Sequence, residues 1–243
     1  MSRRAAAVVA SAAVVLVAAG CESSQDKSAR LAKEGAKAIA GQHGLEIRRR
    51  NPFVHIMQTG VVADQNGTAA AVMLKNTSRG PLGTVPIAIN VIGAGGKSVF
   101  QNNLPGLEPS LVSIAALPPG AELTWVNDQV QAGGKNLTVT ATAGASGDVA
   151  PIGLPQIIVE PPKLIYDPTS GWELTGRITN KSQIPQLKLF VYAVAWRGKQ
   201  LVSAGRGAIQ RLLPGHHADY HIYPIGNPKA AQFTIVAPPT VLR

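Results

Sequence analysis

The densest group of potential metal ligands in the sequence lies in "PGHHADYHI", near the C-terminal end. His217, Asp219 and His221 are two residues apart, so in a β-strand their side chains would share one face. Imidazole and carboxylate groups bind transition metals. Neighbours at this spacing lie about 7 Å apart, however, which is too far for one small ion unless the strand bends. We therefore expect an exposed strand face and no metal site, with His217, Asp219 and His221 as the only candidate ligands.

Residues that could carry catalysis are few. The chain has no Gly-x-Ser-x-Gly motif, and its single cysteine is Cys21. The whole sequence holds 13 Asp and Glu residues, and none after the N-terminal region stands in a recognisable catalytic setting. The segment "GAGGK" looks like a phosphate-binding loop, but it falls in a turn between predicted strands with no helix after it. We therefore predict no enzyme activity and no cofactor, and keep a hydrolase as the alternative.

The N-terminal residues have the features of an export signal. A basic start, Arg3-Arg4, precedes an uncharged stretch at residues 5–20, which is shorter than the about 20 apolar residues that a membrane-spanning helix needs. The small residues "AAG" then lead directly into Cys21. This pattern resembles the lipobox of bacterial lipoproteins, with Ala18 standing where the usual motif has leucine.

The lipobox resemblance implies that the Cys21 thiol carries diacylglycerol, that the new N-terminus is acylated, and that residues 1–20 are removed. Two acyl chains give stable anchoring at roughly 0.8 kcal/mol per buried methylene. The expected location is extracytoplasmic and lipid-anchored to a bacterial cell membrane, and an uncleaved membrane helix is the alternative. Because Cys21 is the only cysteine, the exported fold has no internal disulfide and depends on its core.

The chain is basic, with a formal net charge of +10. Arg48, Arg49 and Arg50 form one dense cluster in a predicted tether. Each contributes about 1 kcal/mol near an anionic lipid surface, so we predict these three as membrane-surface residues; a solvated run is the alternative. The predicted partners are the membrane, through the lipid anchor, and an envelope protein or anionic cell-wall polymer. An exported, anchored protein would not meet nucleic acid, so we exclude that partner.

The predicted secondary structure changes from helix to strand at Pro52. Residues 27–41 contain helix formers with a thin apolar face, which predicts a marginal helix within a flexible tether. After Pro52, β-branched and apolar runs alternate with Gly, Pro and Asn, which predicts strands throughout. The predicted fold is all-β, with two tandem immunoglobulin-like β-sandwiches. The expected parts are a lipoprotein signal peptide at 1–20, a lipidated N-terminus and tether at 21–51, a first sandwich at 52–147 and a second at 148–243.

The two predicted sandwiches carry the same markers in the same order. "VMLKNTS" matches "GRITNKS", "GGKSVFQ" matches "RGKQLVS", and "LPPGAELTW" matches "LLPGHHADY". In each copy the Asn-x-Ser segment ends a strand, because its short polar side chains can bond nearby backbone and turn the chain. The first copy is longer, and we place its extra residues in "NNLPGLEPSLVS" at 102–113. The pattern predicts a tandem duplication of one β module.

The order of these markers resembles the FxLYD and related immunoglobulin-like modules of bacterial lipoproteins. "FVYAVAWRGK" keeps Phe190 and the Gly-Lys turn but has no Leu-Tyr-Asp. The resemblance implies an extracytoplasmic β-sandwich without catalysis. The expected function is therefore non-catalytic binding of a protein or envelope polymer; the alternatives are an envelope hydrolase, a metal-binding protein and a passive structural spacer.

The predicted core is richest around "LFVYAVAW", which is apolar on both alternating faces. Such a strand is expected to be central and covered on both sides. We expect Trp125, Phe190, Tyr192 and Trp196 in the core, because the residues around them are apolar. A ligand platform would need these rings exposed.

Overall fold

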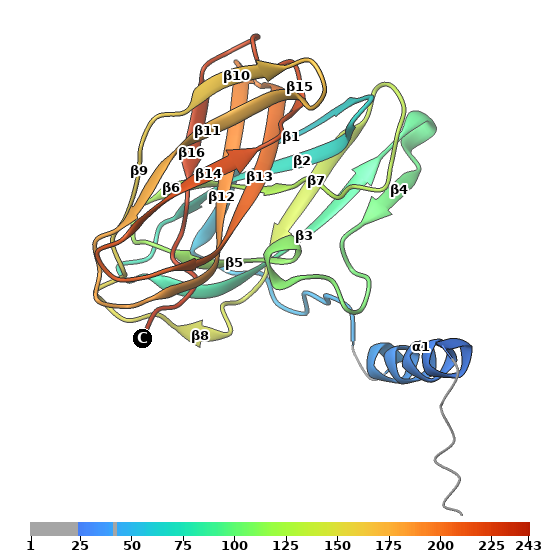
Figure 1. The fold of residues 1–243 in the computed structure, drawn as a ribbon, viewed down its shortest axis with the longest axis horizontal. Helices are drawn as coiled ribbons and strands as arrows, with labels where there is room; N and C mark the ends of the chain where they lie inside the picture. The colour runs from blue at the N-terminus through green and yellow to red at the C-terminus, as the bar shows by residue number, and fades with distance from the viewer. Residues whose placement is uncertain (1–23, 41–42) are drawn as a thin grey trace, which may run out of the picture. The chain divides into compact units, whose positions relative to one another are not determined.

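The computed structural model describes residues 24–40 and 43–243, which form one helix and a β-rich unit (Figure 1). Helix α1 (Ser24–Ala40) contains mainly alanine, lysine and other helix formers. Arg30 and Glu34, one turn apart, form an exposed ion pair at 3.2 Å. The predicted helix in the tether is thus confirmed. Within the described residues, no helix combines the length and the apolar character needed to cross a membrane.

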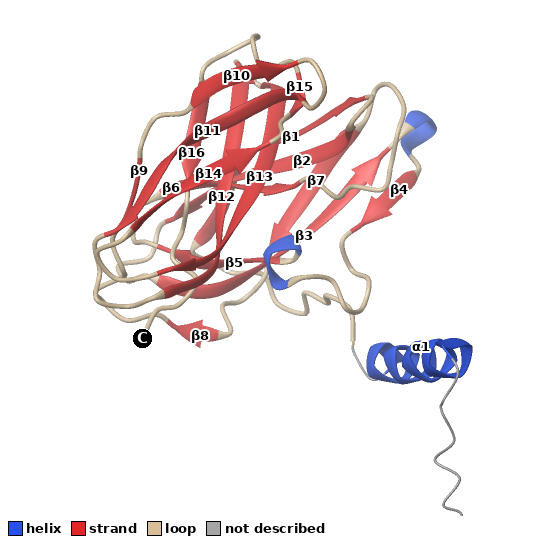
Figure 2. Cartoon of the chain, in the orientation of Figure 1, coloured by secondary structure: helices blue, strands red, loops and turns tan. Residues whose placement is uncertain are grey.

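Strands are the main secondary structure of the β-rich unit, which confirms the all-β fold class (Figure 2). In its first half, one antiparallel sheet has the order β1-β2-β6, and in the other sheet β3 pairs with β4, β5, β7 and β8. Leu74 and Trp125 from the first sheet and Ile87 from the second belong to one buried cluster. The elements are β1 (Val54–Asp64), β2 (Gly67–Asn76), β3 (Leu82–Ile92), η1 (Ala94–Gly96), β4 (Ser98–Gln101), η2 (Pro109–Leu111), β5 (Ser113–Leu117), β6 (Glu122–Asn127), β7 (Thr138–Ala143) and β8 (Asp148–Val149).

The second half repeats this arrangement. One sheet has the order β10-β11-β14, with β9 also paired to β11, and the other has the order β15-β13-β12-β16. Along one edge, β12 pairs with the single strand β13 over its whole length. The corresponding edge of β3 pairs with β5 near the start of β3 and with β4 near its end. Residues 102–112 interrupt the first copy between β4 and β5, where the sequence comparison placed the insertion. The strands are β9 (Ile157–Val159), β10 (Lys163–Asp167), β11 (Gly171–Asn180), β12 (Gln186–Arg197), β13 (Gln200–Leu212), β14 (His217–Ile222), β15 (Ile225–Gly226) and β16 (Phe233–Val236).

Strand β12 is covered on both faces, as its sequence predicts. Leu189 and Val191 point into the core of the second half, whereas Phe190 and Tyr192 belong to the cluster that fills the first half. Of the four aromatic residues expected in the core, Trp125, Phe190 and Tyr192 are buried, and Trp196 packs against the same cluster while partly buried. The two halves therefore share a hydrophobic core.

Small residues let the two inner sheets approach closely. Ala69, Ala70 and Ala71 of β2 are fully buried although their side chains alternate between the faces of the sheet. At Gly60 in β1, a Cβ atom would lie 2.6 Å from the Cβ of Leu201 in β13. Strand β13 also contacts β2 and β6. The sheets β1-β2-β6 and β15-β13-β12-β16 thus pack face to face, and the two remaining sheets lie outside them.

A buried asparagine ends the same strand in each half. The Asn180 side chain is fully buried at the end of β11. Its amide donates to the carbonyl oxygens of Ile184 at 2.8 Å and Leu212 at 3.2 Å. Its side-chain oxygen accepts from the Ser182 backbone N–H at 3.0 Å and from the Ser182 hydroxyl at 2.7 Å. One side chain thus ties the turn after β11 to the end of β13.

Asn76 makes the equivalent bonds in the first half. Its amide donates to the carbonyl oxygens of Gly80 and Leu117, both at 3.0 Å, and its side-chain oxygen accepts from the N–H and hydroxyl of Ser78. The Gly120 N–H of the following Pro-Gly turn donates to the Asn76 carbonyl at 2.9 Å. The sequence markers Asn-x-Ser and Pro-Gly therefore recur together because they meet in one hydrogen-bonded junction.

The β-rich unit begins before the predicted boundary at residue 52. Arg50 forms a β-bridge with Gly144, and the Ala145 N–H donates to the Arg49 carbonyl at 2.9 Å. The Asn51 N–H donates to the carbonyl of Ala143 at 3.0 Å. The end of the predicted tether is therefore attached to the chain that follows β7.

Candidate functional site

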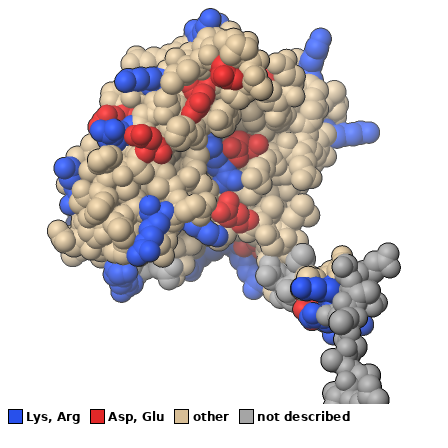
Figure 3. Space-filling model, in the orientation of Figure 1, with Lys and Arg blue, Asp and Glu red and all other residues tan. Residues whose placement is uncertain are grey.

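The predicted lipidation site, Cys21, lies outside the described residues, so its acylation stays a prediction. Arg48, Arg49 and Arg50 are all exposed, and Arg48 forms an ion pair with Glu46 at 3.0 Å. Their contact with a membrane surface also stays a prediction. On the face of the β-rich unit drawn in Figure 3, basic and acidic side chains are interspersed, so this face carries no extended basic patch.

The three candidate metal ligands lie on one exposed face of β14, as their spacing predicts. Two of them, Asp219 and His221, pair with side chains of the neighbouring strand β11. Asp219 accepts from the Arg177 guanidinium at 3.4 Å, and the His221 ring shares a hydrogen bond with the Glu173 carboxylate. Within the described residues, no group of three or more His, Cys, Asp or Glu side chains is arranged to hold a metal ion. Asp219 and His221 thus take part in cross-strand side-chain pairs.

An open cleft of about 1010 Å³ lies at one end of the β-rich unit, where four turns meet. These turns are the β1–β2 hairpin, the β10–β11 hairpin, the β12–β13 hairpin and the segment around β15 (Figure 1). Three aromatic side chains line it, two of them strongly exposed: Tyr166 at 57% and Tyr223 at 56%. Trp172 is the third, and it is half-buried. Both halves of the chain are needed to form this cleft.

The β10–β11 hairpin fixes its aromatic pair through local chemistry. Asp167 accepts hydrogen bonds from the backbone N–H groups of Thr169 and Ser170, both at 2.8 Å, and from the Ser170 hydroxyl. The bonds from Ser170 and Thr169 lower the pKa of the Asp167 carboxyl below its usual value. Gly171 closes the turn at a φ of 83°, a conformation that favours glycine. This turn places Tyr166 and Trp172 directly opposite each other.

The aromatic pair is packed and also covered by a cation. The ring centroids of Tyr166 and Trp172 lie 4.7 Å apart with an interplanar angle of 49°. The Lys229 ammonium lies 4.4 Å from the centroid of the Trp172 ring, which is cation–π geometry. Trp172 therefore packs between Tyr166 and Lys229, while Tyr166 and Tyr223 present most of the exposed aromatic surface of the cleft.

Charged side chains at the cleft form hydrogen bonds with backbone groups of the segments that line it. The Asp64 carboxylate, from the β1–β2 hairpin, accepts from the N–H of Asn66 at 2.7 Å and from the N–H of Gly226 at 2.8 Å. The second bond joins the first half of the chain to β15 in the second half. The Arg197 guanidinium donates to the Ala230 carbonyl at 3.0 Å. Asp64 is the one carboxylate among the described residues that line the cleft, so these residues offer no pair of carboxylates for acid–base catalysis.

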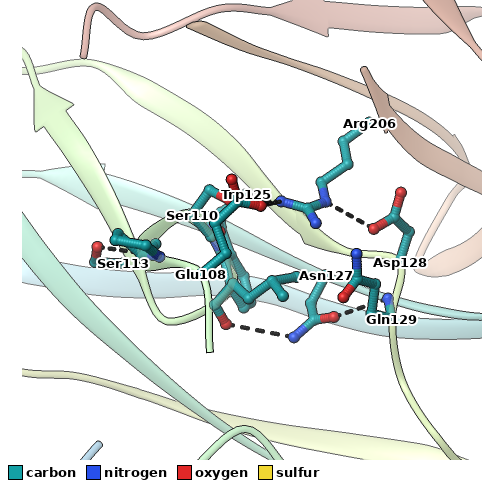
Figure 4. Close-up of polar contacts among 10 residues, drawn as sticks. Glu108, Ser110, Ser113, Trp125, Asn127, Asp128, Gln129 and Arg206 are labelled. Atoms are coloured by element: carbon teal, nitrogen blue, oxygen red, sulfur yellow. Dashed lines mark hydrogen bonds and ion pairs between the residues drawn. The ribbon is translucent and has the colours of Figure 1, made fainter. Parts of the chain in front are cut away.

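Apart from the cleft, a cluster of polar side chains around Arg206 lies between the two halves (Figure 4). The side chain of Arg206, in β13, is 6% exposed, and its Nε donates to Asp128 at 2.7 Å. Its Nη1 donates to the Ser110 hydroxyl at 2.6 Å and lies 3.6 Å from the Glu108 carboxylate. The guanidinium also lies over the Phe190 ring, 5.1 Å from its centroid. A buried cation requires such partners, and two of these come from the 102–112 insertion.

This buried group has a structural role. Burial raises the pKa of the Tyr192 phenol well above its usual value, and the nearby Arg206 charge opposes the shift only in part. The Trp125 indole N–H donates to the Ser110 carbonyl at 2.7 Å, which fixes the insertion against β6. The Arg206 guanidinium is thus held by carboxylates of the protein itself. We conclude that it joins the insertion to the second half.

Sequence reasoning missed the residues of the cleft. It gave weight to aromatic residues within apolar runs, whereas Tyr166, Trp172 and Tyr223 stand next to turn residues. One local signal was available: an aromatic residue flanks each side of the turn "DPTSG", which is the arrangement of a cross-strand pair. Nothing local indicates that Tyr223 would lie across the same cleft.

Comparisons with known proteins do not identify a family. No family model matches the chain, and no curated protein matches it. One similar solved structure is a chain from a chaperone–tip adhesin complex of CFA/I fimbriae, with 13% identity, covering 74% of this chain and 98% of that chain. Its TM-score is 0.19, which is too low to support any statement on function. The expected relation to FxLYD modules stays a prediction.

Proposed function

We propose that this protein is a lipid-anchored, extracytoplasmic, non-catalytic binding protein that holds a component of the bacterial cell envelope in the cleft between its hairpins. The observation that carries the proposal is the cleft itself, about 1010 Å³ in volume with two strongly exposed tyrosines, Tyr166 and Tyr223. Concave sites with rigid aromatic walls and a few placed polar groups are the usual form of ligand sites. A passive spacer would have no use for such a cleft.

The position of the cleft supports an anchored role. Strand β1 begins at Val54, shortly after Arg50, and ends at Asp64 on the cleft wall. Eleven residues of extended strand separate its ends by roughly 35 Å. In Figure 1 the chain enters the β-rich unit at the bottom of the view, and β10 and β15 stand at the top. A protein held through Cys21 would therefore present the cleft at the end remote from its point of attachment.

The anchor is tested by labelling cells with an alkyne fatty acid. The wild-type chain should incorporate the label and fractionate with membranes, whereas Cys21→Ala should do neither. An unlabelled wild-type product in the cytosol would overturn the anchored, extracytoplasmic part of the proposal.

The binding site is tested by crosslinking on intact cells, with a photo-reactive amino acid at position 223 and, as a matched control, at position 53. Phe53 is an exposed aromatic residue, at 51%, that does not line the cleft. Saturable adducts at position 223 and none at position 53 are expected. Equal adducts at both positions, or none at 223, would favour the spacer.

A further inference from the structure

We propose that the ligand of the cleft is an uncharged segment of a polysaccharide chain; this inference rests on the binding function proposed above and names its ligand class. Sugar rings present C–H faces that pack on aromatic rings, and hydroxyl groups that both donate and accept hydrogen bonds. A site for them therefore needs exposed aromatic faces beside neutral polar side chains. The cleft holds both.

Two of the three aromatic side chains, Tyr166 and Trp172, are held in place by packing before any ligand arrives. Tyr166 is 57% exposed, yet its ring packs on Trp172, which Lys229 covers in turn. Tyr223 follows the buried residue Ile222 of β14 and precedes the buried Pro224, so its backbone is held within the fold. Rigid aromatic surfaces lose little conformational entropy when a ligand binds, which favours stacking on them.

The polar part is neutral. Exposed amide and hydroxyl side chains surround the tyrosines, and an amide offers donors and an acceptor that match neighbouring sugar hydroxyls. The charged groups lining the cleft are already engaged inside the protein: Asp64 with two backbone N–H groups and Arg197 with a carbonyl. Arg197 is the one basic side chain among the described residues that line the cleft, and the nearby Lys229 ammonium lies over the Trp172 ring, so an anionic polymer would find no basic cluster here. The exposed neutral side chains are Gln65, Asn66, Thr169, Ser170, Gln200 and Asn227.

The backbone at the cleft argues against an extended peptide. A peptide strand binds through main-chain hydrogen bonds to an open sheet edge. The cleft is walled by turns, and the N–H groups of Asn66, Thr169, Ser170 and Gly226 all donate to carboxylates of the protein itself. The volume, about 1010 Å³, is at the upper end of the range for small-molecule sites, so it suits several sugar rings in a row.

The test uses the full-length lipidated protein, immobilised in detergent, and three pools from the envelope of the source cells. Two are protease-treated polysaccharide, separated by anion exchange into neutral and acidic fractions, and the third is envelope protein. Saturable binding of the neutral pool is expected. The apparent affinity should change less than about twofold between 50 mM and 500 mM salt, because no charge pair is screened.

Two variants locate the binding in the cleft. Tyr166→Ala and Tyr223→Ala should each weaken binding of the neutral pool at least about tenfold, whereas Phe53→Ala should leave it unchanged; thermal unfolding confirms that each variant is folded. Binding of only the acidic pool, or only the protein pool, would overturn the assignment of an uncharged polysaccharide and leave the proposed binding function standing. Binding of none of the three pools would overturn both. Neutral-pool binding that survives both tyrosine variants would overturn the cleft as its site.

Discussion

Replacing Asn180 with alanine tests the buried junction that each half repeats. The side chain makes four hydrogen bonds, and its loss leaves the carbonyls of Ile184 and Leu212 and the N–H of Ser182 without those partners. A buried hydrogen bond contributes about 1 kcal/mol net, and an unsatisfied buried group costs about 1–3 kcal/mol. Some carbonyls will rebind water or relax. We expect Asn180→Ala to lower the free energy of unfolding by about 3–5 kcal/mol.

This loss can be measured by thermal unfolding followed by circular dichroism and tryptophan fluorescence. For a chain of this size, 1 kcal/mol corresponds to about 2–4 °C, so a loss near 4 kcal/mol lowers the Tm by roughly 8–16 °C. Asn76→Ala should lower it similarly, because Asn76 makes the same four bonds. Asn103→Ala is the matched control, since its exposed amide makes one surface bond, and should change stability by less than about 0.5 kcal/mol.

Because the halves share a core, the chain should unfold in one common transition, and both variants should lower the Tm of that transition. A loss below about 1 kcal/mol for Asn180→Ala would refute the argument that the buried amide stabilises the junction. Two separate transitions, each shifted by only one of the variants Asn76→Ala and Asn180→Ala, would refute the argument that the halves unfold together.

Three further predictions concern two contacts between the halves and one buried phenol. Arg206→Met should lower the free energy of unfolding, measured in urea, by about 2–4 kcal/mol, because it leaves partly buried carboxylates unpaired. Arg177→Met, at an exposed ion pair, should lower it by less than about 1 kcal/mol, and equal losses for the two variants would contradict this reasoning. Gly60→Ala should cost about 1–3 kcal/mol through overpacking between the inner sheets, and Gly133→Ala, where a Cβ meets open space, should be neutral. Burial raises the pKa of Tyr220 to about 12, so the unfolded chain loses this proton first; stability present below pH 10 should fall as the pH rises toward 12. Urea unfolding at pH 9 and pH 11 should show a smaller fall in Tyr220→Phe, and an identical fall would count against burial as the cause.

Much of the fold could be predicted from local sequence. Alternating apolar residues and regular turn signals predicted the strands, and the matching Asn-x-Ser and Pro-Gly segments predicted the repeat. These signals are local because Asn76 and Asn180 bond mainly to turns a few residues away. The spacing of His217, Asp219 and His221 likewise predicted that they share an exposed face. Their partners Arg177 and Glu173 could not be predicted, because these follow from the register between β11 and β14.

Local patterns in the sequence were enough to predict an all-β chain with a duplicated module and an apolar strand, β12, that is covered on both sides. The packing of the sheets was needed to see that the first half provides one of those covers. Packing also buries Arg206 against the insertion and brings Tyr166 and Tyr223 to one cleft. Backbone periodicity sets which face of a strand is apolar, whereas the partner of that face depends on how sheets far apart in the sequence pack together.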